Sequence, residues 1–364
     1  MKNLFFTLVF SLIINSVFSQ CNGRYETEIF NNVTKITDVN YSDVYTDSYH
    51  EMDIYMPDGD TATNRPVILY MHGGSFYGGT KTMTDCVDFC EYFAKRGYVC
   101  ASINYRLSNA VSFLIDQDVQ YQTVLKAVAD SKAAIRFFRK DVAENGNTYG
   151  IDETTIFAGG YSAGGVIAVH QGYIDDLSEL PINIQNLASV IGGNIEGDAG
   201  NNGYSSDIQG VVSLAGGIND ISWIDANDAP IVSAQGDNDN TVNYNCGPGL
   251  NNPAILTLCG AGEIHPKADS VGIINDVLVF NNTDHLWAAS GNLNTQFTQA
   301  LDFFSDFLYP LLPCNNITSI SSVNSEKILV KITDLLGRET EKTINTPLFY
   351  IYSNGEVEKK IFIN

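Results

Sequence analysis

Positive charge is scarce in this 364-residue chain. Lys and Arg together number 20 against 42 Asp and Glu, so the formal net charge is −22 at pH 7, and only 17% of the residues are charged. So acidic a surface repels phosphate backbones and anionic lipids, which argues against nucleic-acid binding. The hydrophobic share of 44% and the aromatic share of 11% are those of a folded globular protein and exclude a disordered or fibrous chain.

Long apolar runs are also missing. The apolar run Leu4–Ile14 is too short to cross a bilayer, which takes about 20 residues. It follows a basic start and precedes a small residue at Ser19, which is the pattern of a secretory signal peptide. We therefore expect residues 1–19 to be a signal peptide and the mature protein to be exported, with no transmembrane segment. Gln20 disfavours a lipidated Cys21.

The seven cysteines include neither a CxxC pair nor a Cys/His cluster, so a structural zinc is not expected. In an exported chain they favour disulfides, and their odd number leaves at least one unpaired. Cys246 and Cys259 flank a loop of Gly, Pro and Asn and are the expected bridge. Cys100 lies in an apolar segment and is expected to be an inert core residue.

Short apolar runs alternate with helical patterns between Cys21 and Cys314. The clearest helix is predicted over Asp118–Ala143, with apolar residues three and four apart, and a last helix over Leu293–Tyr309. This alternation predicts an open, mostly parallel α/β sheet in one large domain, residues 20–314. The runs expected to be strands buried on both faces are Pro66–Met71, Tyr98–Asn104, Thr155–Gly159, Val211–Leu214, Ile231–Ala234 and Val277–Phe280.

Ser162 stands directly after one of these predicted strands, in the sequence Gly160-Tyr161-Ser162-Ala163-Gly164. A serine on a sharp turn between a strand and a helix adopts a strained backbone conformation and needs small neighbours. The turn lifts the serine Oγ above the sheet, where the helix N-terminus favours developing negative charge. Ser162 is therefore the candidate nucleophile. The alternative is a glycine-rich helix start with an unreactive serine.

A glycine pair follows another predicted strand, in the sequence His72-Gly73-Gly74-Ser75. Glycines here let backbone N–H groups approach a tetrahedral intermediate. We expect Gly74, with or without Gly73, and the N–H of Ala163 to form an oxyanion hole. His72 is expected to order this loop rather than to transfer a proton.

These segments together resemble the α/β-hydrolase carboxylesterase/lipase family with an HGG-type oxyanion loop. The resemblance covers residues 49–309 and implies an α/β-hydrolase fold and a serine carboxylesterase activity without cofactor or metal. Ser75 stands where many relatives carry a third glycine, which leaves the donor set open. Tyr105, Arg106 and Asp130 are interpreted as structural supports. The segments that carry the resemblance are His72-Gly73-Gly74, Asn104-Tyr105-Arg106-Leu107, Asp130 with Ala133-Ala134-Ile135-Arg136, and Gly160-Tyr161-Ser162-Ala163-Gly164.

The base must follow both the serine and the acid in the chain order Ser, acid, His. Of the five histidines, this order leaves His265 and His285. His265 stands directly before a predicted helix over Pro266–Asn275. His285 comes just after the predicted strand Val277–Phe280, and the sites of α/β sheets gather at that end of the strands. His285 is therefore the expected base.

The acid is expected in the loop of residues 235–242. The family's spacing of three residues after Gly236 selects Asp239, and Asp237 is the alternative. Its role would be to hold the imidazole of His285 in one tautomer and to stabilise the imidazolium. The loop is rich in Asp and Asn, but its spacing fits no known calcium loop, so we do not expect a calcium site.

The end of the chain has a different pattern. Residues 315–324 are a polar Asn/Ser/Thr stretch, predicted to be a linker, and alternating apolar residues with glycine turns predict short strands over 325–364. The segments DLLGRE and NGEVEKKI resemble the C-terminal sorting domain of type IX secretion substrates in Bacteroidota. That resemblance implies the type IX secretion machinery as a partner and a secreted or cell-surface location. A small accessory β-domain is the alternative.

These patterns predict acyl transfer in two steps, in which Ser162 attacks an ester with His285 as base and water releases the acyl-enzyme. Short-acyl or polymer-linked esters are the expected substrates, such as acetylated or feruloylated polysaccharide, short-chain lipid esters or polyesters. The region Asp175–Asp207 is expected to form a modest lid over an open site. The alternatives are a serine peptidase of the same fold and a non-catalytic surface-binding protein.

Overall fold

The computed structural model describes Cys21, residues 23–314 and parts of the tail, namely 329–334, 338, 340, 348–352 and 357–360. The predicted signal peptide and the predicted linker lie outside the described residues. The chain divides into two compact units, Met1–Asn315 and Asn316–Asn364.

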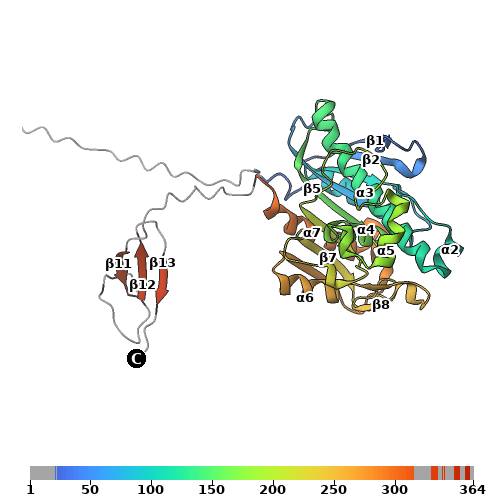
Figure 1. Ribbon diagram of the computed structural model, residues 1–364. Helices are drawn as coiled ribbons and strands as arrows, with labels where there is room; N and C mark the ends of the chain where they lie inside the picture. The colour runs from blue at the N-terminus through green and yellow to red at the C-terminus, as the bar shows by residue number, and fades with distance from the viewer. Residues whose placement is uncertain are drawn as a thin grey trace, which may run out of the picture. The chain divides into compact units, whose positions relative to one another are not determined.

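An eight-stranded sheet forms the centre of the first unit, in the order β1-β2-β4-β3-β5-β6-β7-β10 (Figure 1). The β1–β2 and β2–β4 pairs are antiparallel, and all other neighbours are parallel. The strands are β1 (Val33–Asn40), β2 (Glu51–Pro57), β3 (Arg65–Met71), β4 (Val99–Ile103), β5 (Ile151–Tyr161), β6 (Gly210–Leu214), β7 (Ile231–Gly236) and β10 (Asn275–Phe280).

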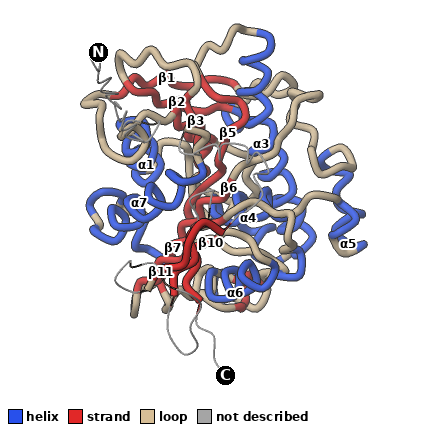
Figure 2. The backbone as a smooth tube through the Cα atoms, turned by 90° about the vertical axis from the view of Figure 1, so that its left-hand side faces the viewer, coloured by secondary structure: helices blue, strands red, loops and turns tan. Residues whose placement is uncertain are grey.

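Helices cover both faces of the sheet (Figure 2). α1 and α7 pack on one face and α3, α4 and α6 on the other, and each layer buries its own apolar core against the strands. β3, β4 and β6 are buried along their whole length, which explains their continuous apolar sequences. The helices are α1 (Thr84–Lys95), α2 (Ala110–Ile115), α3 (Gln117–Glu144), α4 (Ala163–Tyr173), α5 (Ile182–Leu187), α6 (Ala261–Val271) and α7 (Thr295–Leu308).

The predicted fold class, an α/β-hydrolase fold with a mostly parallel sheet, is confirmed. All six expected strands are present, and the two expected helices correspond to α3 and α7 with ends shifted by one or two residues. The strands β1 and β2 were not predicted from the sequence. β1 is an edge strand with mostly exposed side chains, so it lacks the apolar run that marks the buried strands.

The prediction of a helix over Pro266–Asn275 is wrong in its bounds. The helix begins at Ala261, whose N–H donates to the side chain of Gln235, and ends before Gly272, which has φ 86°. Pro266 therefore lies inside α6 and leaves one carbonyl of the preceding turn without its usual helical donor. The left-handed Gly272 ends the helix and leads into β10.

Two disulfides are present among the described residues. Cys246 is bonded to Cys259, as expected from the sequence, and this bond ties the short strands β8 (Cys246–Pro248) and β9 (Thr257–Cys259) into a hairpin. A second bond, which was not predicted, joins Cys21 to Cys314 and so connects the two ends of the first unit. Cys100 is a free, fully buried thiol, as expected, and its Sγ lies 3.0 Å from that of Cys90.

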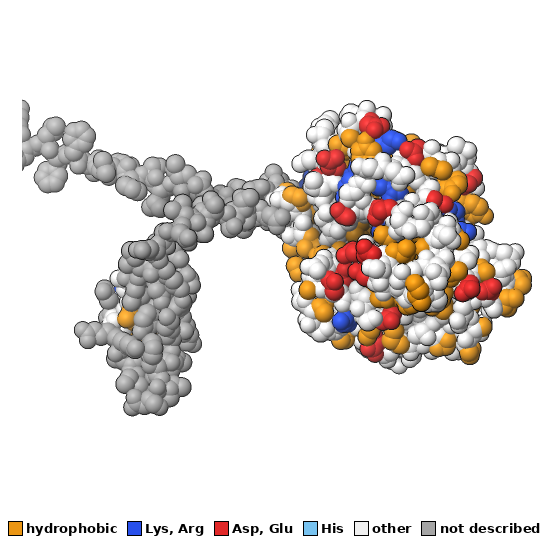
Figure 3. Space-filling view, viewed as in Figure 1, with side chains coloured by type: hydrophobic (Ala, Val, Ile, Leu, Met, Phe, Trp, Pro, Cys, Tyr) orange, Lys and Arg blue, Asp and Glu red, His pale blue; other side chains and the backbone are white. Residues whose placement is uncertain are grey.

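The second unit contains a three-stranded antiparallel sheet of β11 (Leu329–Thr333), β12 (Leu348–Tyr352) and β13 (Val357–Lys360). Acidic side chains form patches over the face of the first unit in Figure 3, in keeping with the net charge of −22. In the part of the chain that the structure describes, no helix is both long and apolar enough to span a membrane.

Candidate active site

Ser162 lies at the turn between β5 and α4. Its backbone has φ 57° and ψ −117°, a conformation that a residue other than glycine adopts only under constraint. The constraint is close packing against β3. A Cβ atom at Gly164 would lie 1.9 Å from the carbonyl oxygen of Met71, and one at Gly160 would lie 2.6 Å from it. The two glycines therefore let the turn pack closely against β3. The strained turn places the serine hydroxyl at the surface of a hollow, within reach of His285.

His285 lies within hydrogen-bonding distance of both other candidate residues. Its Nε2 is 2.7 Å from Ser162 Oγ, and its Nδ1 is 2.7 Å from Asp239 Oδ2. All three side chains are buried, with 5%, 6% and 3% of the surface of His285, Ser162 and Asp239 exposed. The structure thus brings together the three residues selected from the sequence. In this geometry the imidazole can accept the serine proton while the carboxylate holds the Nδ1–H.

Asp239 is held in place by the backbone of its own loop and by Gln235. Its Oδ1 accepts hydrogen bonds from the N–H groups of Thr241 at 2.9 Å and Val242 at 3.0 Å. Its Oδ2 also accepts from Gln235 Nε2 at 3.3 Å. Gln235 is buried near the end of β7; the same Nε2 also donates to the carbonyl of Val242, and its Oε1 accepts from the N–H of Ala261. Gln235 was not predicted from the sequence as a residue of the site. The only indication of its role in the sequence is that a polar residue stands at the end of an apolar strand.

Asp237 and His265, the alternatives for acid and base, lie apart from Ser162. Asp237 Oδ1 accepts a hydrogen bond of 2.6 Å from the N–H of Asn282, which ties the acid loop to the loop that carries His285. His265 Nδ1 lies 2.7 Å from Asn275 Oδ1, and burial lowers the pKa of this imidazole. Both residues therefore have structural partners away from the nucleophile.

The loop after β3 passes beside the nucleophile. A Cβ atom at Gly73 would lie 3.4 Å from the Cβ of Ser162, so this part of the loop and the serine are in contact. Gly74 has φ 118°, and a Cβ there would lie 2.1 Å from the carbonyl oxygen of Gly78. The carbonyl of Gly74 accepts hydrogen bonds from the N–H groups of Tyr77 and Gly78. The tight turn therefore requires glycine at position 74.

Unpaired backbone N–H groups lie in the oxyanion loop and at the start of α4. Among the described residues, those of the predicted donors Gly73, Gly74 and Ala163 make no hydrogen bond within the protein, and neither does that of Ser75. Ser75 has φ 55° and lines the hollow together with Ser162 and Ala163. Unpaired N–H groups at this position suit a developing oxyanion. Ser75 was not among the predicted donors, although its place after the glycine pair marks it in the sequence.

His72 supports this loop, as expected. Its Nδ1 lies 2.6 Å from the carbonyl oxygen of Gly73, and its ring stacks on that of Tyr105 with centroids 4.2 Å apart. Burial lowers the pKa of His72 to about 4, so the imidazole is neutral near pH 7. Tyr105 donates a hydrogen bond of 2.7 Å to the carbonyl of His72. These contacts fix the loop, and none of them joins His72 to the serine hydroxyl.

The other residues interpreted as supports bind one another. The backbone N–H and the Nε of Arg106 each donate a 2.8 Å hydrogen bond to the fully buried carboxylate of Asp130. Arg106 also pairs with Asp198, which lies in the segment that follows α5. The pair thus anchors the loop after β4 to α3.

Tyr161 is a further residue that the sequence analysis did not single out. Its hydroxyl donates a hydrogen bond of 3.0 Å to the carbonyl oxygen of His285, and its ring stacks on the imidazole at 5.3 Å between centroids. Tyr161 directly precedes Ser162 in the chain. Through these two contacts it positions His285, the base that accepts the proton of Ser162. No group of three His, Cys, Asp or Glu side chains in the described residues is suited to hold a metal ion.

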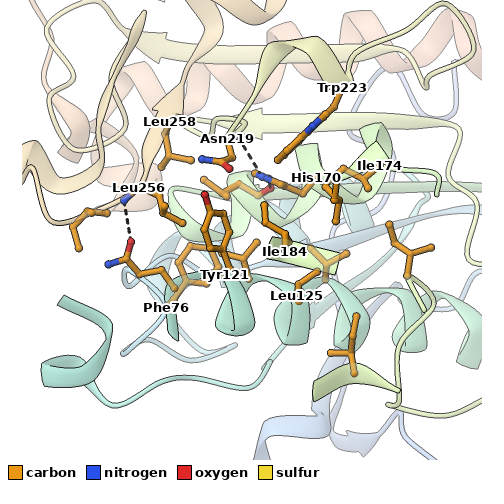
Figure 4. A pocket seen from close by; sticks show the side chains of 18 of the residues that line it. Phe76, Tyr121, Leu125, His170, Ile174, Ile184, Asn219, Trp223, Leu256 and Leu258 are labelled. Atoms are coloured by element: carbon orange, nitrogen blue, oxygen red, sulfur yellow. Dashed lines mark hydrogen bonds between the residues drawn. The ribbon is translucent and has the colours of Figure 1, made fainter. Parts of the chain in front are cut away.

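Two hollows adjoin at this site. The niche is the hollow that Ser162 and the oxyanion-loop residue Ser75 both line, and the chamber is the hollow between α3, α4 and residues 174–195 (Figure 4). The niche is lined by Ser75, Phe76, Phe113, Ser162, Ala163, Val166, Thr241, Val242, Gly249, Leu250, Ile255 and Leu258.

The chain has the α/β-hydrolase fold. The model of the BD-FAE family matches residues 52–216, which is less than half of the chain. No curated protein matches the chain in sequence.

Among solved structures, a truncated carbohydrate esterase from gut microbiota is similar, with a TM-score of 0.53, 20% identity and coverage of 76% of this chain and 96% of that one. Esterase 2 of the planctomycete Thermogutta terrifontis, phosphoramylated by tabun, has a TM-score of 0.55 and 21% identity, with coverage of 76% and 94%. The same esterase with bound propionate has a TM-score of 0.54 and 20% identity, with coverage of 75% and 93%. These similarities show the shared fold.

Proposed function

We propose that this chain is a serine carboxylic ester hydrolase. The observation that carries the proposal is the hydrogen-bonded series Ser162–His285–Asp239, with the serine on a strained turn beside unpaired backbone N–H groups. The match to the BD-FAE family and the similarity to structures named as esterases support an ester as the substrate.

In the first step, Ser162 Oγ attacks the carbonyl carbon of the ester and His285 Nε2 takes the hydroxyl proton. Asp239 stabilises the imidazolium that forms. The charge on the carbonyl oxygen is borne by N–H groups of the oxyanion loop and of Ala163, at the start of α4 where the helix dipole adds to the stabilisation.

In the second half, His285 gives its proton to the leaving alcohol, and the acyl group remains on Ser162. A water molecule then attacks the acyl-enzyme with His285 again as the base, which releases the acid and restores the serine. The reaction needs no cofactor. The sequence patterns favour short-acyl or polymer-linked esters as substrates, including acetylated or feruloylated polysaccharide and polyesters, whereas the apolar chamber beside the niche favours a longer aliphatic acyl group.

The decisive experiment compares the chain from residue 20 onward with its Ser162→Ala variant on p-nitrophenyl esters and on peptide p-nitroanilides. Ester turnover that is lost in the variant, with folding shown by circular dichroism, supports the proposal. Peptide turnover without ester turnover would identify a peptidase of the same fold, and no turnover of either by a folded protein would favour a binding protein.

An organophosphate gives an independent test, because an activated serine attacks phosphorus and stays modified. A fluorophosphonate should add one adduct to the wild type, on the peptide that contains Ser162, and none to Ser162→Ala. Labelling elsewhere, or of both proteins equally, would count against Ser162 as the nucleophile. The covalent organophosphate adduct of the Thermogutta terrifontis esterase is the precedent among the similar structures.

We also propose that residues 1–19 direct export and that residues 325–364 are recognised by the type IX secretion machinery, which would place the enzyme outside the cell or on its surface. The basic start and short apolar run support the first part, and the DLLGRE and NGEVEKKI segments support the second.

A further inference from the structure

The chamber follows one side of α4 away from the nucleophile. Val166, His170 and Ile174 line it at intervals of four residues that begin from Ser162. Such spacing keeps side chains on one side of a helix, and the distance from Ser162 to Ile174 along the axis is about 18 Å. The chamber is therefore a long hollow that starts beside the reacting hydroxyl.

The opposite wall is one face of α3, and the roof is the segment 174–195. Tyr121, Val124, Leu125 and Val128 of α3 have the spacing of a single helical face. The roof supplies Leu180, Ile184, Ile191 and Ile195. Figure 4 shows Ile184 between Leu125 of α3 and His170 of α4. The segment predicted to form a modest lid, Asp175–Asp207, thus supplies apolar side chains to the wall of this hollow.

The niche and the chamber adjoin and share walls. Five residues line both hollows, namely Phe76, Phe113, Val166, Ile255 and Leu258. The two hollows therefore meet at Val166 and the other shared side chains. All five are apolar, so the boundary between the niche and the chamber favours hydrocarbon.

Two polar side chains of the chamber wall, those of Gln120 and His170, are hydrogen-bonded within the protein. Gln120 donates to the carbonyls of Phe113 and Ala254 and accepts from the N–H of Leu256. His170 Nδ1 bonds the carbonyl of Val166, and its Nε2 accepts from the N–H of Asn219. Burial lowers the pKa of His170 to about 4, so it carries no charge near pH 7. A sugar or a charged group in the chamber would find these partners already taken.

The position of the base indicates which part of an ester enters. The leaving oxygen must lie within hydrogen-bonding reach of His285 Nε2 to receive a proton. Among the described residues, His285 lines neither the niche nor the chamber. The alcohol part therefore leaves on the side of His285, and the acyl part lies on the side of the chamber.

We propose that the chamber binds the aliphatic chain of the acyl group and makes this protein selective for esters of linear medium-chain acids. The inference rests on the proposed ester hydrolase function. The part of α4 that lines the chamber, from Val166 to Ile174 at its end, is about 12 Å long and takes about ten carbons of an extended chain, since each bond of about 1.5 Å advances somewhat less than its length. Binding of the acyl chain removes the apolar surface of the chain and that of the chamber wall from water, which favours binding.

The test is the kcat/KM of the chain from residue 20 onward on p-nitrophenyl esters from acetate to hexadecanoate, with methyl cinnamate as an aromatic acid ester. We expect kcat/KM to rise by about two- to fourfold per added methylene as far as roughly the decanoate and then to level off or fall. A maximum at acetate, or faster turnover of the aromatic ester than of the decanoate ester, would overturn the proposal.

A pair of variants on α5 locates the effect. Ile184 is 3% exposed and lines the chamber, whereas Ile182 on the same helix is 68% exposed and does not. Ile184→Trp fills the hollow, so the ratio of kcat/KM for decanoate over acetate should fall by about tenfold or more. Ile182→Trp should leave the ratio within about twofold. Because each ratio is measured on one protein sample, a fraction of misfolded protein does not change it.

A binding measurement separates this proposal from the proposed function. The chain has two tryptophans, and of these Trp223 lines the chamber while Trp287 lies in the core beside α7. In Ser162→Ala, decanoate should change the emission of Trp223 and acetate should not, and Trp223→Phe should abolish the change. Ester turnover without this response overturns the chamber proposal alone. The response without turnover keeps the chamber site and overturns the hydrolase proposal.

Discussion

At the scale of single residues, the two neighbouring carboxylates Asp237 and Asp239 are expected to differ in function, because only Asp239 contacts His285. Asp239→Asn should lower kcat by about 10⁴-fold, because an amide at this position no longer favours the tautomer that accepts the serine proton. Asp237→Asn is the matched control, since its side-chain oxygen can still accept from Asn282, and kcat should stay within about threefold. Kinetics on one p-nitrophenyl ester compare the two variants. A larger loss in Asp237→Asn would reassign the acid.

Asp85 in the first turn of α1 is a buried carboxyl group without a charged partner among the described residues. Its Oδ2 accepts from the hydroxyl of Tyr70 at 3.2 Å, and its Oδ1 has no hydrogen bond. Burial raises the pKa of Asp85 from 3.8 to about 6. The folded state therefore holds the proton more tightly than the unfolded state. The stabilisation that comes with this proton is complete below about pH 4 and is lost as the pH rises through about 6.

Asp85→Asn should accordingly stabilise the protein at pH 8, where wild-type Asp85 is a buried charge, and change little at pH 4.5. We expect a gain of about 1 to 2 kcal/mol in the free energy of unfolding at pH 8, less than the pKa shift alone implies because the new amide nitrogen also needs a partner. Urea unfolding at both pH values measures it, with Glu91→Gln on the same helix as control. Equal effects at the two pH values would contradict the assignment.

At the scale of elements, the two disulfides close loops of very different length. The bond between Cys21 and Cys314 spans 293 residues, and the one between Cys246 and Cys259 spans 13. The loss of chain entropy in the unfolded state predicts stabilisations of about 6 and about 3 kcal/mol. Removing the first pair by Cys→Ser changes should therefore cost more stability in urea unfolding. The opposite order would mean that contacts of the β8–β9 hairpin outweigh loop entropy.

The β8–β9 hairpin also carries function at this scale. The residues between its two strands supply Leu250 and Ile255, and β9 supplies Leu258, to the walls beside Ser162. The disulfide thus fixes a wall of the niche as well as a loop.

At the scale of the whole molecule, every candidate catalytic residue lies in the first compact unit. Ending the chain at residue 315 should therefore leave kcat and KM within about twofold of those of the full chain. In a bacterium with a type IX system, the same truncation should retain the enzyme inside the cell envelope, while the full chain reaches the surface or the medium. Kinetics and cell fractionation measure the two effects. Normal secretion of the truncated chain would overturn the proposed sorting role of residues 325–364.

The sequence by itself determined the parts of the protein that depend on neighbouring residues. The turn at Ser162 follows from small residues next to the serine, and α3 follows from its apolar spacing. His285 and Asp239 were found from chain order, family spacing and their place after strands. β1 was missed because an exposed edge strand has no apolar run, and Gln235 because its role depends on a loop folded over it.

Only the tertiary structure decided the shape of the site. The chamber is made by α3, α4, residues 174–195 and the β8–β9 hairpin, which are far apart in the sequence and contact one another only after packing. The sequence of each segment is typical of an ordinary apolar helix or loop. The spacing of apolar residues predicts which side chains are buried, but it does not predict whether the space between the buried side chains is filled. The bond between Cys21 and Cys314 depends in the same way on a long-range approach of the chain ends. Local sequence patterns determined the chemistry of the site, and long-range packing determined its capacity for a substrate.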